Sequence, residues 1–125
     1  MYQNLTVIQT SAAMAQHAGA RQAIIAANIA NADTPGYRAM ALPAFAVALR
    51  EGGSPLARTR PGHLGASPLA SRAEAVESTA EFSPNGNNVS IEQEMLASVE
   101  SMREHSRALA IWRHSISVIR TSLGR

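Results

Sequence analysis

Several residue types are missing or scarce in this chain of 125 residues. Cysteine is absent, which excludes disulfides and thiolate metal sites. Lysine is absent too, so all eleven basic residues are arginine. Only two Phe, two Tyr and one Trp are present, and alanine, which buries little surface, is the most frequent apolar residue. We therefore do not expect the chain to build a large core of its own.

Long hydrophobic runs are also missing. No stretch approaches the eighteen or so apolar residues of a membrane span, and the N-terminus lacks the basic start and apolar run of a signal peptide. We therefore expect neither direct membrane insertion nor a cleaved signal peptide. The length of 125 residues favours a single domain.

The residues that break helices are concentrated in the middle of the chain. All six prolines and six of the eight glycines lie between Pro35 and Gly86. We therefore expect an all-α fold in three parts: an N-terminal helix and turn over 1–37, an irregular Pro/Gly-rich insert over 38–89, and a C-terminal helix over 90–125.

The first helix is expected from about Asn4 to Ala32, where no proline and a single glycine occur. Its apolar residues recur at steps of three and four and form one narrow stripe of mostly small side chains. The stripe consists of Leu5, Ile8, Ala12, Ala15, Ile25 and Ile29.

The second helix is expected from Ser90 to Leu123 and carries a seven-residue repeat of large apolar side chains. We call this repeat the heptad seam: Met95, Met102, Leu109, Ile116 and Leu123, accompanied by Ile91, Val99, Trp112 and Ile119. The two helices are expected to pack as a coiled coil, with this seam against Ile8, Ala15, Ile25 and Ile29. Two such helices cannot bury both their faces in one chain, so we expect order to depend on assembly.

Local signals predict smaller features. Ser90 to Gln93 fits a capping box, in which the Ser90 and Gln93 side chains satisfy amides of the first helical turn. Pro84-Asn85-Gly86 predicts a turn, and Ala44 to Arg50 predicts a helix of two turns. A brief hairpin is possible over 56–64.

The end of the first helix is marked by Thr34, Pro35, Gly36 and Tyr37. Pro35 disfavours helix at Thr34, and Gly36 can adopt the positive φ that a type II turn requires. Asn28 and Asn31 lie three residues apart on the last helical turn. Their amides are expected to bond unpaired helix carbonyls or the backbone of a neighbouring subunit.

The string ANIANADTPGYRA resembles the N-terminal signature of the bacterial flagellar axial family, which comprises rod, hook and hook-associated proteins. The matching residues are Ala27, Asn28, Ile29, Ala30, Asn31, Thr34, Pro35, Gly36, Tyr37 and Arg38. Three further features resemble the short proximal rod proteins of that family: the short chain, the string TRPGHL at 59–64, and GNNV at 86–89 leading into Glu94-Met95.

This resemblance implies a structural subunit of the proximal rod, within the axial tube that transmits torque and encloses the export channel. Implied partners are other copies of the chain, the other proximal rod proteins, the membrane-supramembrane ring with its adaptor protein, and the flagellar type III export apparatus. The implied location is the periplasmic rod of the basal body, reached without cleavage of a signal peptide. Neither enzymatic activity nor a cofactor is implied.

Other functions are weighed against this interpretation. The four histidines show no spacing typical of a metal site, and no Gly-x-Ser-x-Gly or phosphate-binding loop occurs. The five arginines from Arg103 to Arg125 leave a helical nucleic-acid-binding module as an alternative, although Glu100 and Glu104 lie near them. A dimeric helical interaction module is the other alternative. We expect Asn28, Asn31, Thr34, Pro35, Gly36 and Tyr37 to form an inter-subunit joint, and the heptad seam with Val99, Trp112 and Ile119 to pack between subunits.

Overall fold

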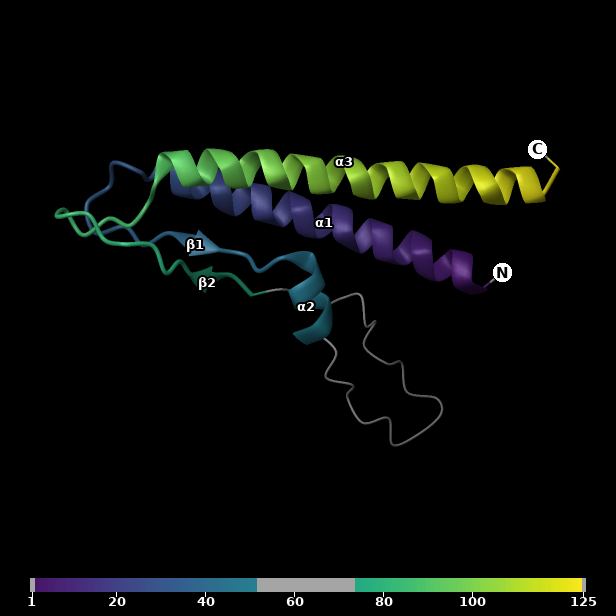
Figure 1. Cartoon of the computed structure of the whole chain (residues 1–125), viewed down its shortest axis with the longest axis horizontal. Helices are drawn as coiled ribbons and strands as arrows, with labels where there is room; N and C mark the ends of the chain where they lie inside the picture. Colours follow the sequence, from purple (N-terminus) through teal and green to yellow (C-terminus); the bar gives the residue numbers. More distant parts are fainter. Residues whose placement is uncertain (1, 52–73, 125) are drawn as a thin grey trace, which may run out of the picture.

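The computed structural model describes residues 2–51 and 74–124 and consists of two long helices with a small insert beside them. The element order is α1 (Tyr2–Ala30), β1 (Met40–Ala41), α2 (Phe45–Glu51), β2 (Val76–Glu77) and α3 (Ile91–Ser122). Helices α1 and α3 run side by side in opposite directions, so both chain termini lie at the same end of the pair (Figure 1). The hairpin considered over 56–64 lies outside the described residues.

The predicted helices are confirmed, with bounds shifted by one or two residues. The last turn of α3 contains Arg120, which faces the negative end of the helix dipole, and its first turn contains Glu92 and Glu94 at the positive end. Ser90 is the N-cap residue, and its carbonyl accepts a hydrogen bond of 3.0 Å from the amide of Glu94. The predicted capping box is wrong, because the Ser90 side chain makes no capping hydrogen bond.

The interface between α1 and α3 is built from small and polar residues. Along α3, the buried residues are Ser101 and Ala108, seven positions apart, and along α1 the buried positions Ser11, Ala18 and Ile25 follow the same spacing. The Ser101 hydroxyl donates a hydrogen bond of 2.9 Å to the backbone oxygen of Ala18. Small side chains at these positions allow the two backbones to approach closely.

Three members of the heptad seam lie outside this interface, whereas Leu109, Ile116 and Ile119 are half-buried. Met95, Met102 and Leu123 are 60%, 61% and 67% exposed, and the buried positions Ser101 and Ala108 each precede a seam residue by one. One residue rotates a helix position by about 100°, so these three residues face sideways and outward. The predicted packing of these three residues against α1 of the same chain is therefore wrong.

The described part of the insert, residues 38–51 and 74–89, packs against α1 on the side away from α3 (Figure 1). Strands β1 and β2 form an antiparallel pair with Met40 opposite Glu77 and Ala41 opposite Val76. The predicted short helix is confirmed as α2, and among the described residues of the insert Ala39, Leu42 and Ala48 are buried and apolar. The two-stranded pair itself was not expected from the sequence.

Candidate functional site

Two glycine turns meet where α1 ends and α3 begins. In the first turn, the amide of Tyr37 donates to the oxygen of Thr34 at 3.2 Å and Gly36 has a φ of 72°, which confirms the predicted turn. In the second turn, the amide of Gly86 donates to the oxygen of Ser83 at 2.9 Å, and Gly86 has a φ of 79°. The turn predicted at Pro84-Asn85-Gly86 is therefore also confirmed.

The two turns touch backbone to backbone. The amide of Gly36 donates to the oxygen of Asn85 at 3.1 Å. A side chain at Gly86 would place its Cβ 3.5 Å from the Cα of Gly36. Both glycines therefore serve a positive φ, which residues with a Cβ tolerate poorly, whereas a Cβ at Gly86 would make only an ordinary van der Waals contact with Gly36.

Asn28 connects the end of α1 to β1 and to α3. Its side-chain amide donates to the backbone oxygen of Met40 at 2.7 Å and to Oε1 of Glu94 at 2.9 Å. Its Oδ1 accepts from the backbone amide of Met40 at 3.1 Å and from the Tyr37 hydroxyl at 3.4 Å. Asn28 is only 1% exposed, so this complete set of partners compensates for its burial.

Asn87 gathers the carbonyl groups at the end of α1. Its side-chain nitrogen lies 3.0, 2.8 and 2.9 Å from the backbone oxygens of Asn31, Ala32 and Thr34. Its Oδ1 accepts from the amide of Val89 at 2.7 Å. Carbonyls that follow the last helical turn have no hydrogen-bond donor within the helix. The Asn87 side chain, which comes from the second turn, supplies a donor to these carbonyls of the first turn.

Asn88 likewise joins two segments of the insert through hydrogen bonds of its side chain. Its Oδ1 accepts from the amide of Ala39 at 2.6 Å, and its Nδ2 donates to the oxygen of Ser78 at 3.2 Å. Asn28, Asn87 and Asn88 are at most 2% exposed. We call these three residues the asparagine cluster, and it fastens α1, the insert and α3 to one another.

The predicted joint residues differ in their contacts: some form hydrogen bonds within the subunit, and others are exposed. Asn31 bonds its own helix, with its Nδ2 2.8 Å from the oxygen of Ala27, which also accepts the backbone amide of Asn31 and so is not an unpaired carbonyl. Asn28 and Tyr37 bond within the subunit. Thr34, Pro35 and Gly36 are exposed and accessible to a neighbour. Sequence reasoning missed the roles of Asn87 and Asn88, for which the only signal was their place in the GNNV string.

Polar contacts continue along the helix pair. The guanidinium of Arg21 lies 3.6 Å from Glu100 and 3.5 Å from Glu104. The Gln22 amide donates to the Ser98 hydroxyl at 2.9 Å. Together with the contact between Asn28 and Glu94, these bonds fix the register of the two helices.

His17 lies where α1 meets α2. Its ring packs edge-on against Phe45 with the ring centres 5.5 Å apart, and neither ring nitrogen has a hydrogen-bond partner among the described residues. Burial is the main cause of a lowered pKa at His17. The carboxylate of Glu104 and the backbone of Pro43 raise this pKa, and the positive charge of Arg21 lowers it further. The neutral ring therefore acts as a packing group.

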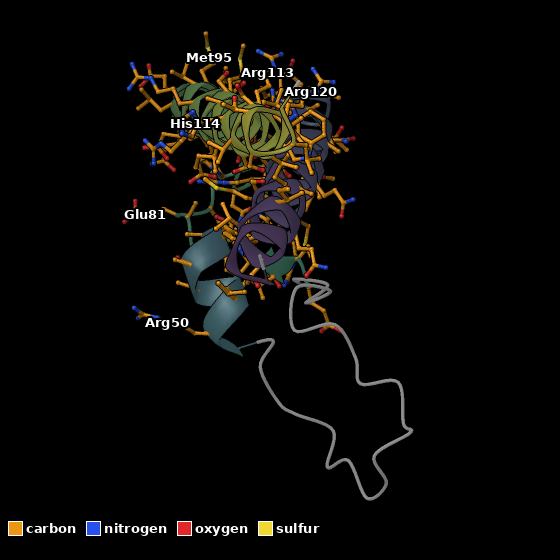
Figure 2. The ribbon with its side chains drawn as sticks, turned by 90° about the vertical axis from the view of Figure 1, so that its right-hand side faces the viewer. Arg50, Glu81, Met95, Arg113, His114 and Arg120 are labelled. Atoms are coloured by element: carbon orange, nitrogen blue, oxygen red, sulfur yellow. The ribbon has the colours of Figure 1, made fainter. Side chains whose placement is uncertain are left out.

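Much of the outer surface of α3 is apolar. Met95, Leu96, Val99 and Met102 are all exposed in its first three turns, and Trp112, Val118 and Leu123 are exposed further along. Figure 2 shows Met95, Arg113 and Arg120 extending from α3 away from α1. Exposed apolar groups in such number are typical of a surface that a partner covers.

The site has the chemistry of a joint. Amides, carbonyls, a hydroxyl and the Glu94 carboxylate form its hydrogen bonds, and in residues 2–51 and 74–124 no three His, Asp or Glu side chains gather as metal ligands. In that part of the chain, no helix is long and apolar enough to cross a membrane.

Comparison with known proteins agrees with this arrangement. Residues 8–38, which hold most of α1 and the whole first turn, match the model of a family described as "Flagella basal body rod protein". The chain belongs to this family of structural proteins of the bacterial flagellum. Membership is shown by its likeness to the flagellar basal body rod protein FlgB of Agrobacterium fabrum, with 30% identity over 109 residues, 82% of this chain and 81% of that relative.

Proposed function

We propose that this chain is a subunit of the proximal part of the flagellar rod, where it assembles into the axial tube that transmits torque and encloses the export channel. The observation that carries the proposal is the likeness to FlgB, which extends over 109 residues rather than the turn motif alone. The exposed apolar face of α3 supports it, because a tube subunit needs surfaces that neighbours cover.

The partners of this subunit are further copies of itself, the other proximal rod proteins, and the membrane-supramembrane ring with its adaptor protein. It reaches the periplasmic rod through the flagellar type III export apparatus with its N-terminus intact, and it has no catalytic activity. In the assembled tube, the α1–α3 pair belongs to a larger coiled coil. The heptad seam together with Val99, Trp112 and Ile119 packs between subunits, and the exposed turn at Thr34, Pro35 and Gly36 forms part of the joint.

Deletion of the gene, followed by electron microscopy of isolated basal bodies, tests this function. We expect the deletion strain to lack the rod beyond the membrane ring and to be non-motile, and a plasmid copy of the gene to restore both. Detection of the chain at the base of the rod in restored basal bodies would place it proximally. Normal motility without the gene, or wild-type basal bodies that lack the chain, would refute the proposal.

The dependence of order on assembly has its own test. Far-ultraviolet circular dichroism over a dilution series should show helix content falling as the subunit is diluted, because isolated helices are marginally stable. Full helicity at every concentration, with a sharp cooperative melt, would contradict this part of the proposal.

A further inference from the structure

The second glycine turn contains the only Asn-Gly pair of the sequence, Asn85-Gly86. Asparagine is one of the residues that change chemically with time, and a following glycine favours the change because no side chain hinders the approach of its backbone nitrogen. Asn85 and Gly86 are both exposed, so water reaches them. The pair therefore carries the reactive groups of a deamidation site.

Deamidation at such a pair needs only the chain and water. The Gly86 nitrogen bonds to the side-chain carbon Cγ of Asn85, the bond from Cγ to the side-chain nitrogen breaks, and ammonia leaves with the proton of Gly86. Water then opens the resulting succinimide ring at one of its carbonyl carbons. One opening gives aspartate. The other gives isoaspartate, in which the main chain runs through Cβ and Cγ and is one atom longer.

The closed fold holds the peptide bond between Asn85 and Gly86 at both of its polar atoms. Its oxygen accepts from the amide of Gly36 at 3.1 Å, and its nitrogen donates to the oxygen of Ser83 at 2.9 Å. The Asn85 side chain is held as well, because its Oδ1 accepts from the amide of Asn87 at 3.0 Å. Ring closure requires rotation of this peptide and loss of its N–H proton, so these hydrogen bonds oppose the reaction.

This restraint depends on contact between segments that are distant in the sequence. Gly36 belongs to the first turn, and the Asn87 side chain binds the first-turn oxygens of Ala32 and Thr34. A chain in which the two turns are apart lacks all of these bonds. The Asn85-Gly86 pair is then held only by local bonds, which a short segment forms weakly in water.

We propose that Asn85 is a deamidation site of the open chain and that contact between the two glycine turns protects it. The product acts back on the fold. The amide of Ser83 donates to the oxygen of Asn87 at 2.8 Å, and isoaspartate lengthens the main chain between these two residues. Asn87 is thereby displaced from the first turn. A chain that stays open thus loses stability of its closed state with time, whatever its place in the rod.

Comparison of deamidation rates in the closed and the open chain tests the protection. The purified full chain is incubated at pH 8 in urea, and also in buffer at the concentration where circular dichroism shows the highest helix content. Peptide mass spectrometry measures the change from amide to acid at Asn85, and an isoaspartyl methyltransferase measures isoaspartate. We expect a rate at least tenfold lower in buffer than in urea. Equal rates would overturn the inference.

A variant that separates the turns sharpens this test. Asn87→Ala removes the side-chain bonds to the first turn and leaves the Asn85-Gly86 pair intact. In buffer we expect Asn85 to react at least threefold faster than in the wild type, and in urea at the same rate. Thr121→Ala, exposed near the end of α3, is the control and should change neither rate. An Asn87→Ala rate in buffer equal to that of the wild type would refute protection by the contact.

Ageing tests the effect of the product on the fold. Asn85→Gln carries a longer side chain, whose ring closure is far slower, so it keeps its amide. Both chains are aged in urea, returned to buffer and unfolded again. We expect the urea midpoint of helix loss to fall as isoaspartate accumulates in the wild type, and to match the unaged sample in Asn85→Gln. A wild-type chain that contains isoaspartate and keeps its midpoint would refute this effect.

Discussion

A surface helix of a globular protein usually has an apolar inner face and a polar outer face, and α3 shows the reverse. The inner face, toward α1, buries Ser101 and Ala108 and places Ser98 and Glu94 in hydrogen bonds with α1. The outer face exposes Met95, Leu96, Val99 and Met102. Hydrogen bonds with fixed geometry thus set the register inside the subunit, while the surface that would gain most from burial is exposed in the single chain.

Loss of Asn28 should have the largest effect on the inner face. Asn28→Ala leaves the backbone of Met40 and the carboxylate of Glu94 without their partner, so we expect the free energy of unfolding to fall by about 3 kcal/mol. The measurement is the midpoint of urea-induced helix loss at a concentration where the wild type is fully helical. Asn31→Ala, whose side chain makes an exposed bond, should cost about 1 kcal/mol. Equal effects would mean that burial of Asn28 is unimportant.

Exchanging residue types between the two faces sharpens the comparison. Ser101→Met forces a large side chain into the close contact with Ala18, and we expect a loss of about 2 kcal/mol in urea denaturation. Met102→Ser on the outer face should change subunit stability by less than about 0.5 kcal/mol. It should nevertheless reduce incorporation into basal bodies, measured by immunoblot. If Met102→Ser destabilised the subunit as much as Ser101→Met, the contrast between the faces would be lost.

The first glycine turn gives a smaller effect. Gly36→Ala places a Cβ on a residue with a φ of 72°, so we expect a cost of about 1 kcal/mol in the same urea assay. The matched change Gly19→Ala lies within α1, where alanine is preferred, and should be neutral or stabilising by up to about 1 kcal/mol. Stabilisation by Gly36→Ala would contradict the turn geometry.

The smallest effect should be a dependence of stability on pH through His17. The pKa of His17 is lowered in the folded chain from its ordinary value of about 6.5, so between the two values the unfolded chain binds more protons. Stability is therefore fully present above about pH 6.5 and falls as the pH drops through this window. Urea midpoints measured from pH 7.5 to pH 5 should show the fall, and His17→Phe should flatten it. An unchanged slope in His17→Phe would assign the effect to another group.

Local chemistry made the helices and turns predictable. Proline and glycine positions bounded α1, α2 and both turns, because these residues restrict or widen the allowed φ of single positions. Strands β1 and β2 have two residues each, which is too short for an alternating pattern. The capping box at Ser90 failed because a matching string does not guarantee the side-chain bond.

Neither the face of α3 that contacts α1 nor the asparagine cluster could be predicted from the sequence, and the reason is the same for both. Prediction from periodicity relies on large apolar residues, so it selected the repeat through Met95 and Met102 as the contact face. The neighbouring repeat through Ser101 and Ala108 was therefore overlooked. That second repeat faces inward because of partners on α1, such as Ala18, far away in the sequence. Asn87 likewise has its role only where its turn meets the end of α1.

The bonds of the asparagine cluster join residues far apart along the chain: Asn28 to Glu94 spans 66 residues, and Asn87 to Asn31 spans 56. A polypeptide that passes through a narrow pore cannot form these hydrogen bonds until both bonded segments have left the pore, whichever end of the chain leaves first. Contacts of such long range also form late and slowly. If the chain is exported as proposed, the asparagine cluster therefore forms after transit rather than during it.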